Sequence, residues 1–274
     1  MSTTRPSLRE TKSFSRSIID DEEDSKIKEA QKKRKALVKE LVETEEDFNR
    51  DMQFIANTYL KHMNSSIIPK NLRDQKDALF RNFKEIADFH NEVLMKGIQY
   101  YANEDHSKLG TAFLRLERDF DKHVVYCQDL EESLKLLESG ELKDYFDSYS
   151  LKIKDDKKLK DHLKLPVQRI NDYQLLLKEL IRFTARLSED TEDLEKAHEM
   201  MQAIPQRAVD LQYLNAIHGY KGNLQKSGRL LRQVLRAKLS STFLHTIKWV
   251  ICIVYKNRFN VQLNRLTIKR MFHH

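Results

Sequence analysis

The sequence predicts an all-α protein, an elongated helical bundle of about six main helices, and three observations support this prediction. Only 6 Gly and 4 Pro occur among 274 residues, so few positions interrupt regular structure. Leu, Lys and Glu are abundant, as is typical of helical proteins. Apolar residues recur every three or four positions over long stretches, which is the period of one helical face. No period of about 20 to 50 residues repeats, which argues against a helical solenoid.

A leader and one long helix are expected first. Residues 1–25 are rich in Ser, Thr, Arg and Asp and have almost no apolar periodicity, so we expect them to be disordered. The first helix is expected over residues 26–63, and Asn64-Ser65-Ser66 together with Pro69 ends it. Its apolar face consists of Leu37, Leu41, Thr44, Phe48, Met52, Ile55 and Tyr59.

Two further helices are expected over residues 72–101 and 108–137, each with an apolar stripe. His90 lies beside the first stripe, and we interpret it as a packed or hydrogen-bonded residue rather than a metal ligand. Cys127 lies on the second stripe and is interpreted as a small core residue rather than a reactive thiol. Shorter amphipathic pieces follow over residues 141–162.

The most unusual helix is expected over residues 163–184, because it is apolar on almost every face. Such a helix is normally buried in the middle of a protein. Pro166 suits its first turn. Its polar side chains must reach water, a neighbouring helix or a partner, so we expect one exposed strip; they are Gln168, Arg169, Asn171, Asp172, Lys178 and Glu179. In a last helix over residues 192–217, Pro205 should produce a kink or a break.

The charge is distributed unevenly along the chain. The formal net charge is +7, yet no Asp or Glu follows Asp210, and residues 211–274 hold twelve Lys or Arg. Residues 1–210 hold 37 basic and 42 acidic side chains, a net charge of −5. The excess of Lys and Arg over Asp and Glu therefore lies in the tail, and it does not indicate that the body binds nucleic acid.

The basic tail has three interpretations. Residues 243–255 are apolar, but 13 residues that include His245 and Lys248 are too short and too polar to span a membrane, which takes about 20 residues. The tail is then an edge-like strand, a segment in weak contact with anionic lipid, or a truncated C-terminus without an evolved fold. We favour the last interpretation.

The signatures of covalent catalysis are missing from the sequence. It contains no glycine-rich phosphate loop, no paired His at metal-ligand spacing and no nucleophile elbow, so we expect no enzyme active site, no metal and no cofactor. Cys127 and Cys252 lie far apart and form no disulfide framework, which fits a reducing compartment. The polar N-terminus lacks a secretory signal, and a cytoplasmic location follows.

Five segments, in order, resemble the conserved regions of Dbl-homology domains, the helical modules of Rho-family guanine nucleotide exchange factors. The similarity is strongest for PVQRINDYQLLLKEL at 166–180; the other segments are 37–48, 79–90, 120–137 and 204–224. The pattern looks nearest to the Trio, Kalirin and obscurin/UNC-89 members. The expected domains are a leader (1–25), a Dbl-homology-like domain (26–222), and a truncated pleckstrin-homology start with the basic tail (223–274).

The resemblance implies a non-covalent exchange factor that binds both switch segments of a Rho-family GTPase and promotes release of GDP. The alternative is an exchange-inactive helical scaffold for a GTPase or a cytoskeletal partner, and either fits a cytoplasmic, cytoskeleton-associated protein. The resemblance places GTPase contacts at Glu40, Gln168, Arg169, Asn171, Asp172, Lys178, Val209 and Asp210. Two of these depart from the family pattern, because Asp172 stands where Lys is common and Val209 where Asn is common.

Overall fold

The computed structural model describes residues 8–138 and 140–215 of the chain, with the side chains of residues 22–138 and 140–213. It divides into two compact units, residues 1–204 and 205–274. Only the end of one helix is described in the second unit. The expected pleckstrin-homology start and basic tail (223–274) lie outside the described residues, as do residues 1–7 of the expected leader.

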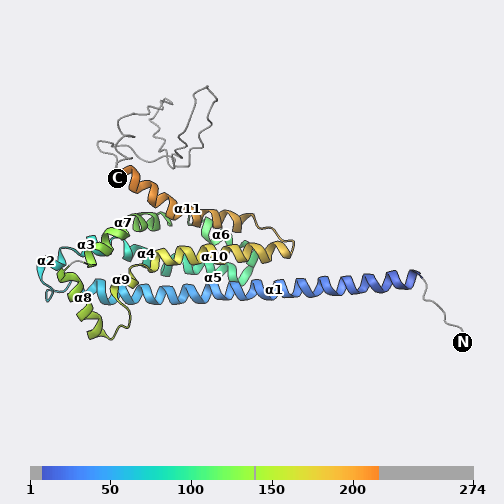
Figure 1. Cartoon of the computed structure of the whole chain (residues 1–274), viewed down its shortest axis with the longest axis horizontal. Coiled ribbons are helices and arrows are strands. Elements are labelled where there is room, and N and C mark those ends of the chain that lie inside the picture. Colours follow the sequence, from blue (N-terminus) through green and yellow to red (C-terminus); the bar gives the residue numbers. More distant parts are fainter. Residues whose placement is uncertain (1–7, 139, 216–274) are drawn as a thin grey trace, which may run out of the picture. The chain divides into compact units, whose positions relative to one another are not determined.

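The regular structure of the described residues is helical throughout, and the all-α prediction is confirmed (Figure 1). Three short helices of other types are η1 (Ala56–Leu60) and η2 (His90–Leu94), both π-helical, and η3 (His106–Lys108), a 3₁₀-helix. The α-helices are α1 (Leu8–Ile55), α2 (Lys70–Arg73), α3 (Lys76–Phe80), α4 (Phe83–Phe89), α5 (Met95–Glu104), α6 (Gly110–Leu114), α7 (Asp121–Glu138), α8 (Gly140–Ile153), α9 (Leu159–His162), α10 (Leu165–Arg186) and α11 (Glu192–Asn215).

Helix α1 is longer than expected, because it begins at Leu8 and not near residue 26. The part of the leader that the structure describes, residues 8–25, is therefore helical where disorder was expected. No Gly or Pro interrupts this stretch, and Glu22 pairs with Lys26 one turn later at 2.8 Å. The absence of helix breakers thus allows the helix to extend beyond the expected start.

The two helices expected over 72–101 and 108–137 are each broken into shorter ones. Helix α3 ends where Arg81 adopts a positive φ of 50°. The Arg81 guanidinium donates to Glu132 of α7 at 2.9 Å and holds this turn against the neighbouring helix. In the second stretch Gly110 begins α6 at a close approach, since a Cβ there would lie 2.4 Å from the backbone of Asp193. A tertiary contact thus holds the break at Arg81, whereas the break between Leu114 and Asp121 lies beyond Gly110.

Helix α11 is continuous across Pro205, so of the kink or break expected there the break does not occur. Proline has no N–H and leaves the carbonyl of the residue four positions earlier, Met201, without its helical donor. The side chain of Gln174 in α10 donates to that carbonyl at 3.3 Å. A neighbouring helix thus supplies the hydrogen bond that the proline removes.

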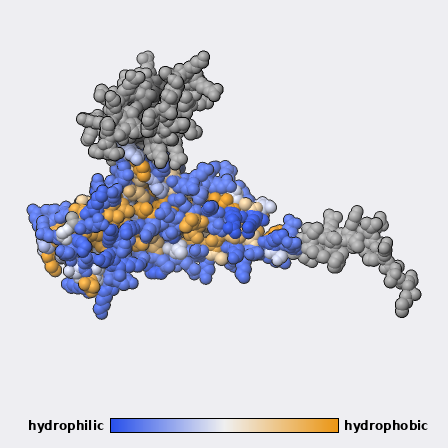
Figure 2. Space-filling model, in the orientation of Figure 1, coloured by the Kyte–Doolittle hydropathy of each residue, from blue (hydrophilic) through white to orange (hydrophobic). Residues whose placement is uncertain are grey.

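The core of residues 1–204 runs along α1 and η1, where side chains such as Leu41, Met52 and Tyr59 are fully buried. His90 is also fully buried and hydrogen-bonded, as expected. Cys127 is partly buried, and burial raises the pKa of its thiol to about 11, which suits a core residue and not a reactive one. The face shown in Figure 2 is largely hydrophilic with scattered hydrophobic patches.

Candidate functional site

Helix α10 lies alongside α1 and runs in the opposite direction (Figure 1). Two ion pairs define the antiparallel register. Arg34 of α1 donates to Glu189, just beyond the C-terminus of α10, at 2.9 Å. Arg169, in the first turns of α10, donates to Glu45 of α1 at 2.9 Å. The two helices are therefore tied together near both ends of α10.

The contact between Arg169 and Glu45 is buried, with exposed fractions of 3% and 0%. Arg169 also donates to Thr44 Oγ1 at 3.0 Å and lies over the ring of Tyr173, 4.4 Å from its centroid. Glu45 accepts further hydrogen bonds from Tyr173 and from His90 Nδ1. The expectation that Arg169 contacts a partner is thus not supported: its side chain is a core group that joins the two helices.

These interactions keep the ion pair charged. Burial tends to raise the pKa of Glu45, but His90, Arg169 and the hydroxyl of Tyr173 outweigh burial and hold it below its usual range. Burial and the Glu45 carboxylate raise the pKa of Tyr173 well above its usual range, so its hydroxyl stays a donor. Breaking one partner away would leave a charge in the interior, which is costly.

The other predicted residues of α10 form an exposed strip. Gln168, Asn171, Asp172 and Lys178 are all exposed and repeat at the spacing of one helical face. Leu175 lies among them and is 67% exposed, which is unusual for a leucine. The expected exposed strip of this helix is therefore confirmed, and it offers amide, carboxylate, ammonium and apolar groups to the outside.

Glu40 of α1 is also exposed. It lies one turn before Thr44, the residue that accepts a hydrogen bond from Arg169. Because α1 and α10 are antiparallel, one turn back along α1 corresponds to about one turn forward from Arg169 along α10. Glu40 is therefore level with the turn of α10 that carries Asp172.

The Asp172 carboxyl is electrostatically linked to the buried network. Partial burial raises its pKa, and the Arg169 guanidinium acts in the opposite direction. The Asp172 carboxyl thus interacts favourably with a buried cation of its own helix. A lysine at this position would meet like charge there.

Val209 and Asp210 belong to the second compact unit. Val209 is 37% exposed and has no hydrogen-bonding side chain. Asp210 is only 3% exposed and accepts a hydrogen bond from Gln206 at 3.0 Å, so the expectation of an exposed Asp210 contact is not supported.

Glu45 was missed from the sequence, although it carries the contact between α1 and α10. The available signal was its position: it falls between Leu41 and Phe48 on the apolar stripe, where an acid must be buried and needs a partner. His123 was missed for the same reason, since it lies one position from the stripe residue Val124.

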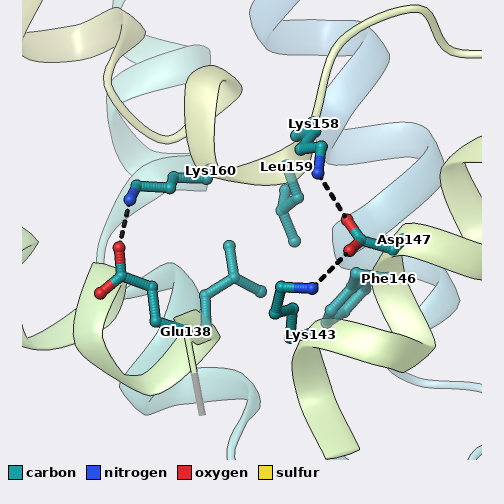
Figure 3. A pocket seen from close by; sticks show the side chains of 8 residues that line it. Glu138, Lys143, Phe146, Asp147, Lys158, Leu159 and Lys160 are labelled. Atoms are coloured by element: carbon teal, nitrogen blue, oxygen red, sulfur yellow. Dashed lines mark hydrogen bonds and ion pairs between the residues drawn. The ribbon is translucent and has the colours of Figure 1, made fainter. Parts of the chain in front are cut away.

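A separate cavity of about 250 Å³ lies between α7, α8 and α9 (Figure 3). Its floor is apolar, with Leu137, Phe146 and Leu159, and Asp147 faces both Lys143 and Lys158 at its rim. It holds none of the predicted contact residues. Over the part of the chain with described side chains, no group of His, Cys, Asp and Glu could hold a metal ion, and no described helix is long and apolar enough to cross a membrane.

A family model for the RhoGEF domain matches residues 37–208, which is more than half of the chain. The chain belongs to the RhoGEF family. The predicted resemblance is confirmed, and the matched residues include both Glu40 and the α10 strip.

Three similar proteins illustrate the relationship. Mouse "Rho guanine nucleotide exchange factor 25" is 35% identical over 195 residues, covering 71% of this chain and 31% of the relative. "Muscle M-line assembly protein unc-89" of Caenorhabditis elegans is 33% identical over 201 residues, covering 73% of this chain and 2% of the relative. Human "Proto-oncogene DBL" is 31% identical over 201 residues, covering 72% of this chain and 22% of the relative. The chain thus spans less than a third of each relative.

Solved structures support the fold. Autoinhibited Vav1 aligns with a TM-score of 0.58 at 21% identity, covering 71% of this chain and 38% of that one. The linker-DH/PH domains of p115-RhoGEF align with a TM-score of 0.56 at 18% identity, covering 66% of this chain and 57% of that one. At these identities the likeness establishes a shared helical architecture.

Proposed function

We propose that this chain is a guanine nucleotide exchange factor for a Rho-family GTPase and that it binds both switch segments. The observation that carries the proposal is the exposed strip of α10, held against α1 by the buried pair of Arg169 and Glu45. A fixed strip of mixed polar and apolar groups beside an exposed acid suits recognition of a protein surface.

Exchange requires no covalent step. The chain must bind the nucleotide-free GTPase more tightly than the GDP-bound form, and each tenfold preference corresponds to about 1.4 kcal/mol of differential contact energy. Glu40 supplies a carboxylate for donors of switch I. Asn171 supplies an amide that can donate to and accept from switch II.

The test is release of labelled GDP from RhoA-, Rac1- and Cdc42-type GTPases with and without the full chain. Glu40→Ala should abolish the acceleration. Glu46→Ala is the matched control, since Glu46 is an exposed acid of the same helix whose carboxylate faces Gln99 of α5 instead of α10. No acceleration on any GTPase sinks the exchange proposal, and equal rates for Glu40→Ala and wild type sink the assignment of Glu40.

The second candidate is a scaffold that binds a GTPase or a cytoskeletal partner without exchange. It is favoured by Asp172 and Val209, which stand where the family commonly has Lys and Asn. A lost hydrogen bond to a buried partner costs about 1–3 kcal/mol. A gain of exchange in the Asp172→Lys, Val209→Asn double variant would favour the scaffold for the natural chain, whereas exchange by the natural chain that the double variant does not exceed would favour the first proposal.

We also propose a cytoplasmic, cytoskeleton-associated location, which is supported by the similarity to a muscle M-line assembly protein. Weak contact between the basic tail and anionic lipid stays a prediction from the sequence. Co-sedimentation with phosphatidylserine vesicles that persists after removal of residues 234–274 would refute it.

A further inference from the structure

Two fully buried histidines lie directly behind the ion pair that joins α1 and α10. His90, at the start of η2, places Nδ1 2.8 Å from Glu45 Oε1 and Nε2 2.8 Å from Nε2 of His123 in α7. Both histidines are 0% exposed. The pair therefore continues the network of Arg169, Glu45 and Tyr173 into the centre of the bundle.

The short distance between the two Nε2 atoms determines where the protons are. Glu45 is ionised and can only accept, so His90 Nδ1 carries a hydrogen. When the His90 ring carries no second hydrogen, its Nε2 is a lone pair, and His123 Nε2 then donates to it at 2.8 Å. This leaves His123 Nδ1 as a lone pair with no hydrogen-bond partner of regular geometry among the described residues, while the backbone carbonyl of Pro166 favours a proton on this ring.

One additional proton has one place to go, which is Nδ1 of His123. The pair then holds a positive charge, with one hydrogen still shared between the two Nε2 atoms. A second additional proton would put N–H against N–H at 2.8 Å, which the packing does not allow. The pair is thus a one-proton site.

The surroundings make the charged form unfavourable. Burial and the neighbouring His90 lower the pKa of His123 well below its usual range; the backbone of Pro166 acts in the opposite direction, and Lys122 of α7 adds to the lowering. The only negative group among these neighbours is Glu45, and Arg169 and the hydroxyl of Tyr173 already use it. A protonated pair therefore adds a cation that no further acid balances.

We propose that His90 and His123 are positioning residues that make GTPase binding proton-linked: the neutral pair holds α1 and α10 in the binding arrangement, and the protonated pair disturbs it. The inference rests on the proposed function. A short chain of hydrogen bonds links the histidines to the proposed GTPase contacts. Glu45 bonds to both His90 and Arg169. Arg169 lies two residues before Asn171 and donates to Thr44, which is one turn from Glu40. Binding therefore weakens as the pH falls.

The test compares affinities at pH 7.5 and at the lowest pH at which circular dichroism shows both proteins folded, because the pKa of His123 lies well below its usual range. The partner is the nucleotide-free GTPase whose GDP release the chain accelerates most. His123→Gln keeps an amide donor for His90 Nε2 and cannot take up a proton. The ratio of the affinities at the two pH values is taken for each protein, so an effect of the substitution that is equal at both pH values cancels. His106→Gln is the matched control, since His106 is a partly buried histidine of η3 whose ring contacts the Ala102 carbonyl.

We expect wild type and His106→Gln to lose about fivefold or more in affinity between the two pH values, the lower end of typical coupling between sites, and His123→Gln to lose clearly less. Imidazole ¹⁵N NMR of the free chain should show the His123 ring as the Nε2–H tautomer at pH 7.5. The same pH ratio in all three proteins, or a His123 ring that is protonated at pH 7.5, overturns the inference and leaves the exchange function intact. Absence of binding to every GTPase at pH 7.5 overturns the proposed function and the link with it.

Discussion

Replacing Arg169 with methionine tests whether the buried ion pair holds α10 against α1. The substitution keeps much of the aliphatic volume and removes the guanidinium. Arg169 donates to Glu45 at 2.9 Å and to Thr44 at 3.0 Å and is 3% exposed. In its absence Glu45, which is 0% exposed, keeps a negative charge with only His90 and Tyr173 as donors.

The expected loss is large because a buried charge stays behind. Removing one member of a buried pair typically costs about 3–5 kcal/mol. A domain is stable by about 5–15 kcal/mol in total, so about a fifth or more of the stability is at stake. For a domain of this size each kcal/mol moves the melting temperature by about 2–4 °C, which predicts a drop of about 6–20 °C.

The assay is urea denaturation followed by circular dichroism, with Arg182→Met as the control. Arg182 belongs to the same helix and pairs with Glu179 at 3.0 Å, but its side chain is 52% exposed. Exposed pairs contribute about 0–1 kcal/mol. If the two variants differ by less than about 1 kcal/mol, the Arg169 pair does not carry the contact between the helices and the reasoning is refuted.

Three further predictions concern pH, packing and the exposed strip. Folding lowers the pKa of His123, so below about pH 6.5 the unfolded chain takes up a proton that the folded chain does not. The free energy of unfolding is therefore independent of this histidine above about pH 6.5 and decreases below it, by at most about 1.4 kcal/mol per pH unit. His123→Gln should flatten the stability between pH 6.5 and 5 in denaturation series, and an unchanged slope contradicts the assignment. Gly110→Ala should destabilise by about 1–3 kcal/mol, because its Cβ would lie 2.4 Å from the backbone of Asp193, whereas Gly97→Ala, with its nearest contact at 3.7 Å, should be neutral or stabilising in the same melts. Leu175→Glu should weaken GTPase binding at least tenfold at unchanged melting temperature, since the leucine is 67% exposed, and binding equal to wild type would remove Leu175 from the contact surface.

Much of the fold followed from periodicity. The α10 helix was expected over 163–184 and is found over Leu165–Arg186, because a long apolar pattern, Pro166 in the first turn and a polar stretch after its end leave little choice. The breaks within 72–101 and 108–137 were not predicted. The turn at Arg81 is held by Glu132 of a distant helix, and the local sequence does not show which residues will be its neighbours in space.

The candidate site was predicted unevenly for a related reason. Spacing alone put Gln168, Asn171 and Asp172 on one strip, and they are exposed. Arg169 was assigned to the same strip because it is polar, although its position four residues before Tyr173 puts it on the core face. Its direction follows from the acid at Glu45, which lies 124 positions earlier in the chain.

The sequence by itself determined the all-α class, the family and the polar strip of α10, since helical period and local motifs are properties of neighbouring residues. Only the tertiary structure decided which polar groups face inward, how Met201 regains a donor opposite Pro205, and that His90 and His123 meet at 2.8 Å. The physical reason is that a buried polar group must find its partner in space, and that partner comes from whichever helix packs beside it.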